Sequence, residues 1–98
     1  MLYTSLTLLK LITNSKGIHP HDAKTWTEDC FELIKELALN PECVAIGECG
    51  LDFNRNFSPP ETQLEVFEKQ VQLACEVKKP LFLHERDAHD DMVKILTK

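Results

Sequence analysis

Val-Ala-Ile-Gly-Glu-Cys-Gly-Leu-Asp, residues 44–52, is the stretch that decides the fold of this chain. It begins with apolar residues that suit a buried strand and changes abruptly to the carboxylate of Glu48, which a glycine turn follows. A second apolar run, Pro80–Leu83, changes in the same way to the imidazole of His84. We therefore predict two strands that each carry a functional side chain at the carboxyl end, where α/β enzymes place their chemistry.

The segment between the two runs has the pattern of one amphipathic helix. It opens with Ser-Pro-Pro-Glu, residues 58–61, a capping-box start with Ser58 as the N-cap. Apolar residues then recur with helical spacing, and the helix should stop near Lys79, before a proline. Two strands joined by such a helix are parallel. If they are neighbours, Glu48 and His84 should lie within about 8 Å of each other.

Each of these two side chains also has a structural interpretation. Glu48 could pair with Arg86 or with a lysine, and His84 could be a half-buried side chain whose hydrogen bonds are satisfied. Their shared place at the same end of consecutive parallel strands favours a function, as half of a metal site.

Composition indicates a small globular protein from inside the cell, cytoplasmic or nuclear. The chain has 98 residues, of which 43% are hydrophobic and 28% charged. Its four cysteines form no CxxC pair and are expected to be reduced thiols; we interpret Cys49 as a small residue in a tight turn rather than a ligand. Residues 1–16 lack the features of a signal peptide, and we expect no membrane span.

The net charge of −5 argues against a simple basic surface for nucleic acid. A substrate that carries phosphate would therefore need a divalent metal to neutralise it.

The rest of the chain continues an alternation of helices and strands. The expected elements are a short helix over 1–15, a strand end at 17–21, a helix opened by a capping box at 25–28 with an apolar stripe from Cys30 to Ala38, a strand over 43–47, a helix over 59–78, a strand over 81–83 and a last helix from Asp87 or Ala88. This pattern is typical of an α/β fold. So few strands cannot close a sheet, so we expect open strand edges and self-association through them.

Three motifs, in order and spacing, resemble the TatD family of metal-dependent deoxyribonucleases. They are GIHPH at 17–21, IGECGLDF at 46–53 and LHERDA at 83–88, and the resemblance runs over about 17–96. It implies a TIM-type (β/α)8 barrel, of which residues 1–98 would be a fragment of a single domain with about three consecutive β/α units. It also implies cleavage of phosphodiester bonds in DNA, often from the 3' end, with two divalent metal ions (Mg, Mn or Zn) in the intact enzyme.

Carried over residue by residue, the resemblance assigns Glu48 as the catalytic, metal-bridging glutamate and His84 as a histidine ligand. It places His19 on a loop that lines the pocket, as a candidate contact to substrate. His21 and His89 are predicted to be surface or capping residues. The other family ligands, an HxH motif on the first strand, a histidine after the fifth and an aspartate on the eighth, have no match in this sequence.

The remaining candidates keep two interpretations each. Arg86 could bind a substrate phosphate or brace the rim by pairing with Asp52 or Asp87, and bracing is slightly favoured. Asp52 could accept a hydrogen bond from His84 or Arg86, or cap the loop that follows it. Asp87 could also support the site from behind, but its place before the last helix is more typical of an N-cap.

Three functions are compatible with these features. The first is a metal-dependent deoxyribonuclease. The second is a truncated isoform or gene-model fragment without catalysis, acting at most as an interaction partner, because half of the implied ligand set is missing. The third is hydrolysis of amides or esters, which the same superfamily also performs. Expressed alone, the chain is expected to bind metal weakly and to be neither an active nuclease nor a well-behaved monomer.

Overall fold

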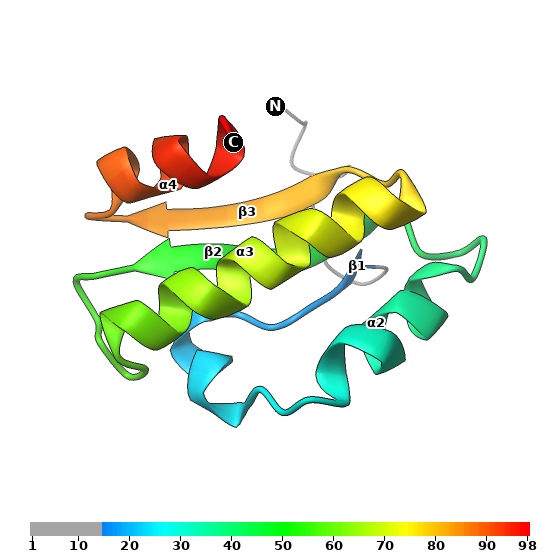
Figure 1. The fold of residues 1–98 in the computed structure, drawn as a ribbon, viewed down its shortest axis with the longest axis horizontal. Helices are drawn as coiled ribbons and strands as arrows, with labels where there is room; N and C mark the ends of the chain where they lie inside the picture. Colours follow the sequence, from blue (N-terminus) through cyan, green and yellow to red (C-terminus); the bar gives the residue numbers. More distant parts are fainter. Residues whose placement is uncertain (1–14) are drawn as a thin grey trace.

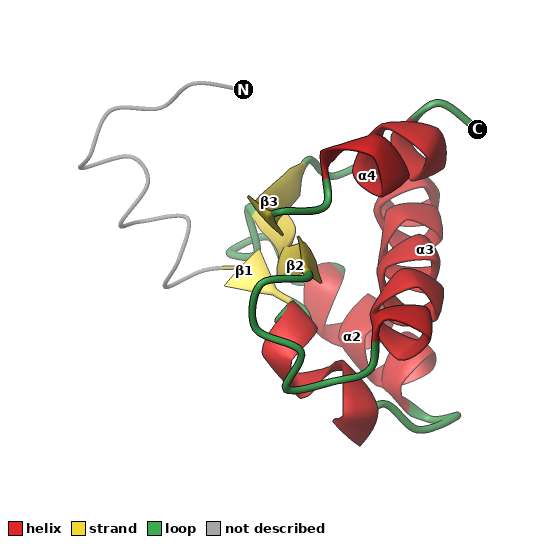
Figure 2. Ribbon diagram, turned by 90° about the vertical axis from the view of Figure 1, so that its left-hand side faces the viewer, coloured by secondary structure: helices red, strands yellow, loops and turns green. Residues whose placement is uncertain are grey.

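A computed structural model of the protein describes residues 15–98 as a parallel sheet with helices packed along one face (Figure 2). In chain order the elements are β1 (Ser15–Lys16), η1 (Pro20–Thr25), α2 (Cys30–Ala38), β2 (Ala45–Asp52), α3 (Pro60–Val77), β3 (Leu81–Arg86) and α4 (His89–Leu96) (Figure 1). The predicted α/β class is confirmed. The helix expected over 1–15 lies outside the described residues, apart from Ser15, which belongs to β1.

The sheet has three strands in the order β1-β2-β3, and both neighbouring pairs are parallel. The predicted neighbours are therefore adjacent and parallel, with α3 as the connection between them. Within residues 15–98, β1 and β3 each pair with β2 alone, which leaves their outer edges open. None of the described helices is long and apolar enough to cross a bilayer.

Both main strands run further than predicted, so Glu48 and His84 lie within strands rather than at their ends. The glycines that suggested a turn are part of β2. Gly50 has a φ of +145°, and a Cβ there would collide with the carbonyl oxygen of His84 on the neighbouring strand. The register shifts between Gly47 and Cys49, which leaves Glu48 as the extra residue of a bulge.

The core lies between α3 and the face of the sheet that this helix covers. Phe67 and Leu73 of α3 are fully buried there. They belong to two core clusters to which β2 contributes Ile46, Cys49 and Leu51. Alternation along a strand therefore turns the intervening residues of β2 to the opposite face.

The apolar stripe predicted for α2 is only half buried. Ile34 and Ala38 enter the core, but Leu33 and Leu37 are 56% and 54% exposed. In the described structure α2 packs against α3 and β1 from one side, so the outer part of its stripe has no cover.

The predicted capping boxes are wrong. Ser58 does not cap α3, which begins two residues later without a side-chain hydrogen bond at its N-cap. The helix after residues 25–28 begins only at Cys30, and α4 is preceded by Ala88 rather than capped by Asp87. Asp87 has a φ of 54°, in the left-handed region. Ser58 is fully buried, and its hydroxyl donates to the carbonyl of His21 instead of capping the helix.

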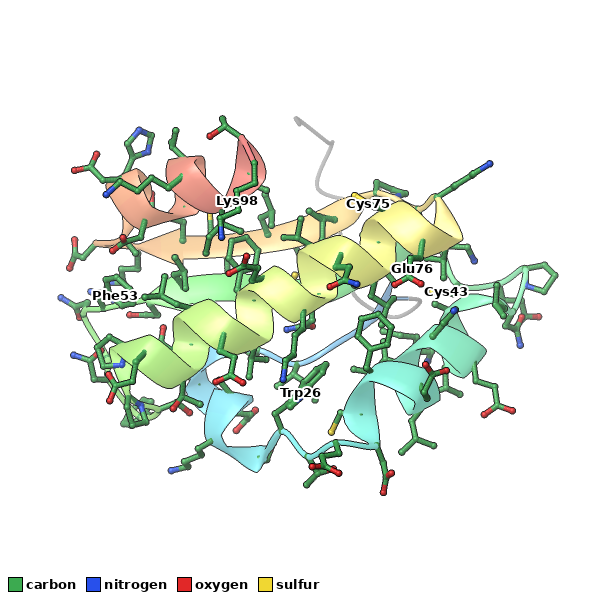
Figure 3. The ribbon with its side chains drawn as sticks, in the orientation of Figure 1. Trp26, Cys43, Phe53, Cys75, Glu76 and Lys98 are labelled. Carbon is green, nitrogen blue, oxygen red and sulfur yellow. The ribbon has the colours of Figure 1, made fainter. Side chains whose placement is uncertain are left out.

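Ion pairs join the helices at the surface. Lys35 of α2 lies 3.5 Å from Glu76 of α3, and Lys98 after α4 pairs with Glu68 of α3 (Figure 3). Exposed pairs of this kind contribute at most about 1 kcal/mol each. The helices are therefore held on the sheet mainly by the buried apolar side chains.

Candidate metal centre

Three histidines from two distant segments gather beside β2 and β3. His19 and His21 flank Pro20, the first residue of η1, and His84 lies on β3. The ring centroid of His19 is 4.3 Å from that of His21 and 4.7 Å from that of His84. One ring nitrogen of each histidine lies within 4.8 Å of the others, so the three side chains form a group that could hold a metal ion.

The prediction that His21 is a surface or capping residue is wrong. Its backbone N–H donates to Nδ1 of His19 at 3.1 Å, so the turn opened by Pro20 folds the two side chains together. The His-Pro-His spacing was the available signal, since proline at the first position favours such a tight helical turn.

Glu48 joins this group from the bulge in β2. Its Oε2 lies 3.5 Å from Nδ1 of His84. Two ligands of one tetrahedral zinc ion, each about 2.1 Å from the metal, lie about 3.4 Å apart. The predicted proximity of Glu48 and His84 is confirmed, whereas their role as ligands stays a prediction.

A buried carboxylate, that of Asp52, holds two of the histidines. Its Oδ2 accepts hydrogen bonds from Nε2 of His84 at 2.9 Å and from Nε2 of His21 at 3.1 Å. Its Oδ1 accepts from the backbone N–H groups of Asn54 and Arg55 at 3.1 and 2.8 Å. Both predicted roles of Asp52, supporting His84 and capping the loop, therefore occur together.

These hydrogen bonds keep Asp52 ionised. Burial alone would raise the pKa of its carboxyl group, but the hydrogen bonds from His84, the Arg55 N–H and His21 outweigh burial and hold the pKa well below its usual range. An ionised carboxylate only accepts hydrogen bonds, so both histidines present a protonated Nε2 to it. Nδ1 of a neutral His84 is then a free lone pair, and it faces Glu48.

His19 has the opposite arrangement. Its Nδ1 accepts the His21 N–H, so in the neutral ring the proton lies on Nε2, and His19 offers a donor rather than a lone pair. Burial, with the neighbouring His21 and His84 rings, lowers the pKa of His19 despite the opposing effect of Glu48. His19 is therefore suited to donate to an anion, and His84 with Glu48 to hold a cation.

The remaining candidates are not drawn into this cluster. Arg86 is exposed and forms no ion pair within residues 15–98, so the predicted bracing through Asp52 or Asp87 is wrong. Asp87 lines a surface hollow with Glu85 and His89, and His89 is exposed as predicted. Arg86 as a phosphate contact and Asp87 as a supporting residue stay predictions.

Cys49 follows Glu48 but its side chain packs in the core. Burial, with the nearby Glu48 charge, raises the pKa of the Cys49 thiol to about 12. A metal ligand must be a thiolate, so this environment argues against Cys49 as a ligand. The tight turn expected at Cys49 is wrong, because this residue lies within β2.

Comparison with known proteins gives one consistent family. Residues 3–98 match the family model described as TatD related DNase. The 3'-5' ssDNA/RNA exonuclease TatD of Erwinia billingiae is 52% identical over 84 residues, which are 86% of this chain and 32% of that protein. The protein of the same name from Escherichia coli K12 is 51% identical over 83 residues, covering 85% and 32%.

A solved structure agrees with these matches. YJJV, a TatD homolog from Escherichia coli K12, superimposes with a TM-score of 0.73 and 27% identity, over 95% of this chain and 39% of that chain. The chain thus spans about a third of the length of the curated relatives it matches.

Proposed function

Because this chain belongs to the family of TatD-related DNases, we propose that it is part of a metal-dependent nuclease whose divalent ion is held by Glu48 and His84. The observation that carries this proposal is the 3.5 Å separation between Oε2 of Glu48 and Nδ1 of His84, the ring nitrogen that does not contact Asp52. Carboxylate and imidazole together suit Mg, Mn or Zn, and we propose two ions in the intact enzyme.

When bound, a divalent metal would supply a Lewis acid that could polarise the phosphodiester and lower the pKa of a water molecule, which would serve as the nucleophile of the hydrolysis. The residues of the chain divide the remaining work. Asp52 holds His84 in the tautomer that frees Nδ1. His19 offers its Nε2–H to a phosphate oxygen, and Arg86, exposed and without an ion pair in the described part of the chain, offers a guanidinium.

We propose further that the three strands are consecutive members of a (β/α)8 barrel and that residues 1–98 form part of one barrel domain. The support is the parallel order β1-β2-β3 with a helix as the β2–β3 connection. In a barrel, the sheet face opposite α3 would line the interior. His84 belongs to this face by alternation, and Glu48 belongs to it by its contact with His84.

The substrate class that these groups favour is nucleic acid. Phosphodiester oxygens match a metal flanked by a neutral imidazole donor and a guanidinium, whereas an amide or ester has no anionic group for these donors to bind. The curated relatives are named as 3'-5' exonucleases of single-stranded DNA and RNA. We propose single-stranded DNA digested from the 3' end as the first substrate to test.

The assay compares the 98-residue chain with the full-length Escherichia coli relative on end-labelled single-stranded DNA with Mn²⁺. The relative is expected to release nucleotides from the 3' end, to stop with EDTA and to recover with added metal. The chain alone is expected to elute larger than a monomer and to release little nucleotide, because its strand edges are open and it lacks the implied remaining ligands.

Simple amide and ester substrates serve as the control in the same assay. Metal-dependent cleavage of these compounds without digestion of DNA would contradict the proposed substrate class. A monomeric, fully active 98-residue chain would contradict the proposal that it is one part of a barrel.

A further inference from the structure

Two glutamines of α3 are buried where an amphipathic helix would normally place apolar residues. Gln63 is 0% and Gln70 is 1% exposed. They are seven residues apart, about two helical turns, so they lie on the same face of α3. Glutamine is rarely buried without a role. Every buried side-chain nitrogen and oxygen in residues 15–98 has a hydrogen-bond partner, so the question is what these two amides hold.

Gln63 binds the backbone of Asp52 in both directions. The Asp52 N–H donates to Oε1 of Gln63 at 2.8 Å, and Nε2 of Gln63 donates to the Asp52 carbonyl at 3.0 Å. The same Nε2 donates to the Ser58 carbonyl at 2.8 Å. Two reciprocal hydrogen bonds to one residue set both the distance of its backbone from α3 and the orientation of that backbone. The residue set in this way is the one whose carboxylate holds His21 and His84.

Gln70 does the same for the other segment. The Ile18 N–H donates to Oε1 of Gln70 at 2.8 Å, and Nε2 of Gln70 donates to the Ile18 carbonyl at 3.1 Å. Ile18 directly precedes His19. Gly17 leaves room for this contact, since a Cβ at that position would lie 2.7 Å from Oε1 of Gln70.

The loop before α3 adds a third connection. The Ser58 hydroxyl donates to the carbonyl of His21 and accepts the N–H of Lys24, both at 2.9 Å. The N-terminal half of α3 and the loop that leads into it lie next to η1 and the carboxyl end of β2 (Figure 1). All segments that carry a site residue before β3 are thus tied to this one helix and its leading loop.

We infer that Gln63 and Gln70 are positioning residues: α3, which contributes no group to the site, sets the spacing between the His19 segment and the Asp52 segment through these two amides. The inference rests on the proposed function only where it assumes that the positioned histidines bind metal or substrate. The geometry it describes concerns the metal-free chain.

The test replaces each glutamine by methionine, which keeps the length and removes the amide. Gln72→Met, on the exposed side of the same helix, is the matched control. The readout is the imidazole NMR spectrum of the four histidines without metal. Gln70→Met is expected to shift the His19 signals most, and Gln63→Met those of His21 and His84. Exposed His89 should stay in place in every variant, and Gln72→Met should shift none.

The inference would be overturned if the imidazole signals of all four histidines shifted equally in both variants, or if no signal shifted in either variant. If a methionine variant does not fold, the wild-type chain decides. The amides of Ile18 and Asp52 are expected to exchange with solvent as slowly as the Ile46 amide, which donates to the Pro80 carbonyl in the sheet. Fast exchange at either would contradict the inference. Segment-specific shifts together with an inactive full-length relative would refute the proposed function and leave the positioning intact.

Discussion

Replacing the glutamate that corresponds to Glu48 by glutamine, in a full-length relative with these motifs, is expected to lower turnover on single-stranded DNA more than about 100-fold. Changes to residues that merely support metal ligands already cost about 10- to 100-fold. Glutamine keeps the shape of the side chain but removes the charge that would face the ion beside His84, 3.5 Å away. The measurement is steady-state digestion at saturating Mn²⁺, where kcat should fall more than KM rises.

Substitution of the His84 equivalent by alanine should have an effect of the same size. Arg86→Ala should have a smaller one, mainly on KM, because an exposed guanidinium contributes binding rather than metal coordination. Glu61→Gln, in the exposed first turn of α3, is the control and should leave turnover unchanged. Near wild-type turnover of the Glu48→Gln variant would show that Glu48 is not a ligand.

Asp52→Asn in the 98-residue chain is expected to lower the free energy of unfolding by about 3 kcal/mol at pH 7. The carboxylate is 1% exposed and accepts four hydrogen bonds. An asparagine keeps only one acceptor oxygen. Its NH2 group would face either the two half-buried histidine donors or the two backbone N–H groups, so two of the four donors would lose their acceptor. Urea unfolding followed by Trp26 fluorescence, in EDTA and at one protein concentration, measures the loss.

The stabilisation by Asp52 is also expected to depend on pH. The pKa of Asp52 is lower in the folded chain than in the unfolded one. Its stabilisation is therefore complete above the unfolded pKa, about 3.9, and is lost as the pH falls through the folded value. The difference between wild type and Asp52→Asn should shrink below about pH 4. A difference that stays constant into acid would contradict the account, and Asp90→Asn, at an exposed position, should show no such difference.

The neighbouring strands and their parallel direction could be predicted because the local patterns agree: two apolar runs flank one long amphipathic helix. The ends of the strands could not be predicted, because the glycines beside Glu48 are compatible with two structures. Glycine opens a turn, but at Gly50 it lets the backbone of β2 pass close to the His84 carbonyl. Which use applies depends on the partner strand, which lies more than thirty residues away in the sequence.

Several site residues were not predicted for the same reason, because their contacts are with residues far away in the sequence. His21 enters the cluster through Asp52, which lies 31 residues further along the chain. Ser58 has the residue type of a helix cap, yet its hydroxyl binds the backbone of η1 instead. Gln63 and Gln70 look like solvent-facing residues of an amphipathic helix, and only the approach of Ile18 and Asp52 makes them buried partners.

The central claim is that Glu48 and His84 hold a divalent ion, and a Mn²⁺ titration of the isotope-labelled 98-residue chain tests it most directly. Paramagnetic broadening reports even a weakly bound ion, which is what two protein donors should give. The side-chain signals of Glu48 and His84 are expected to broaden first, and Glu48→Gln should abolish this effect. Broadening that begins instead at the exposed acidic residues near His89, or that persists unchanged in Glu48→Gln, would contradict the claim.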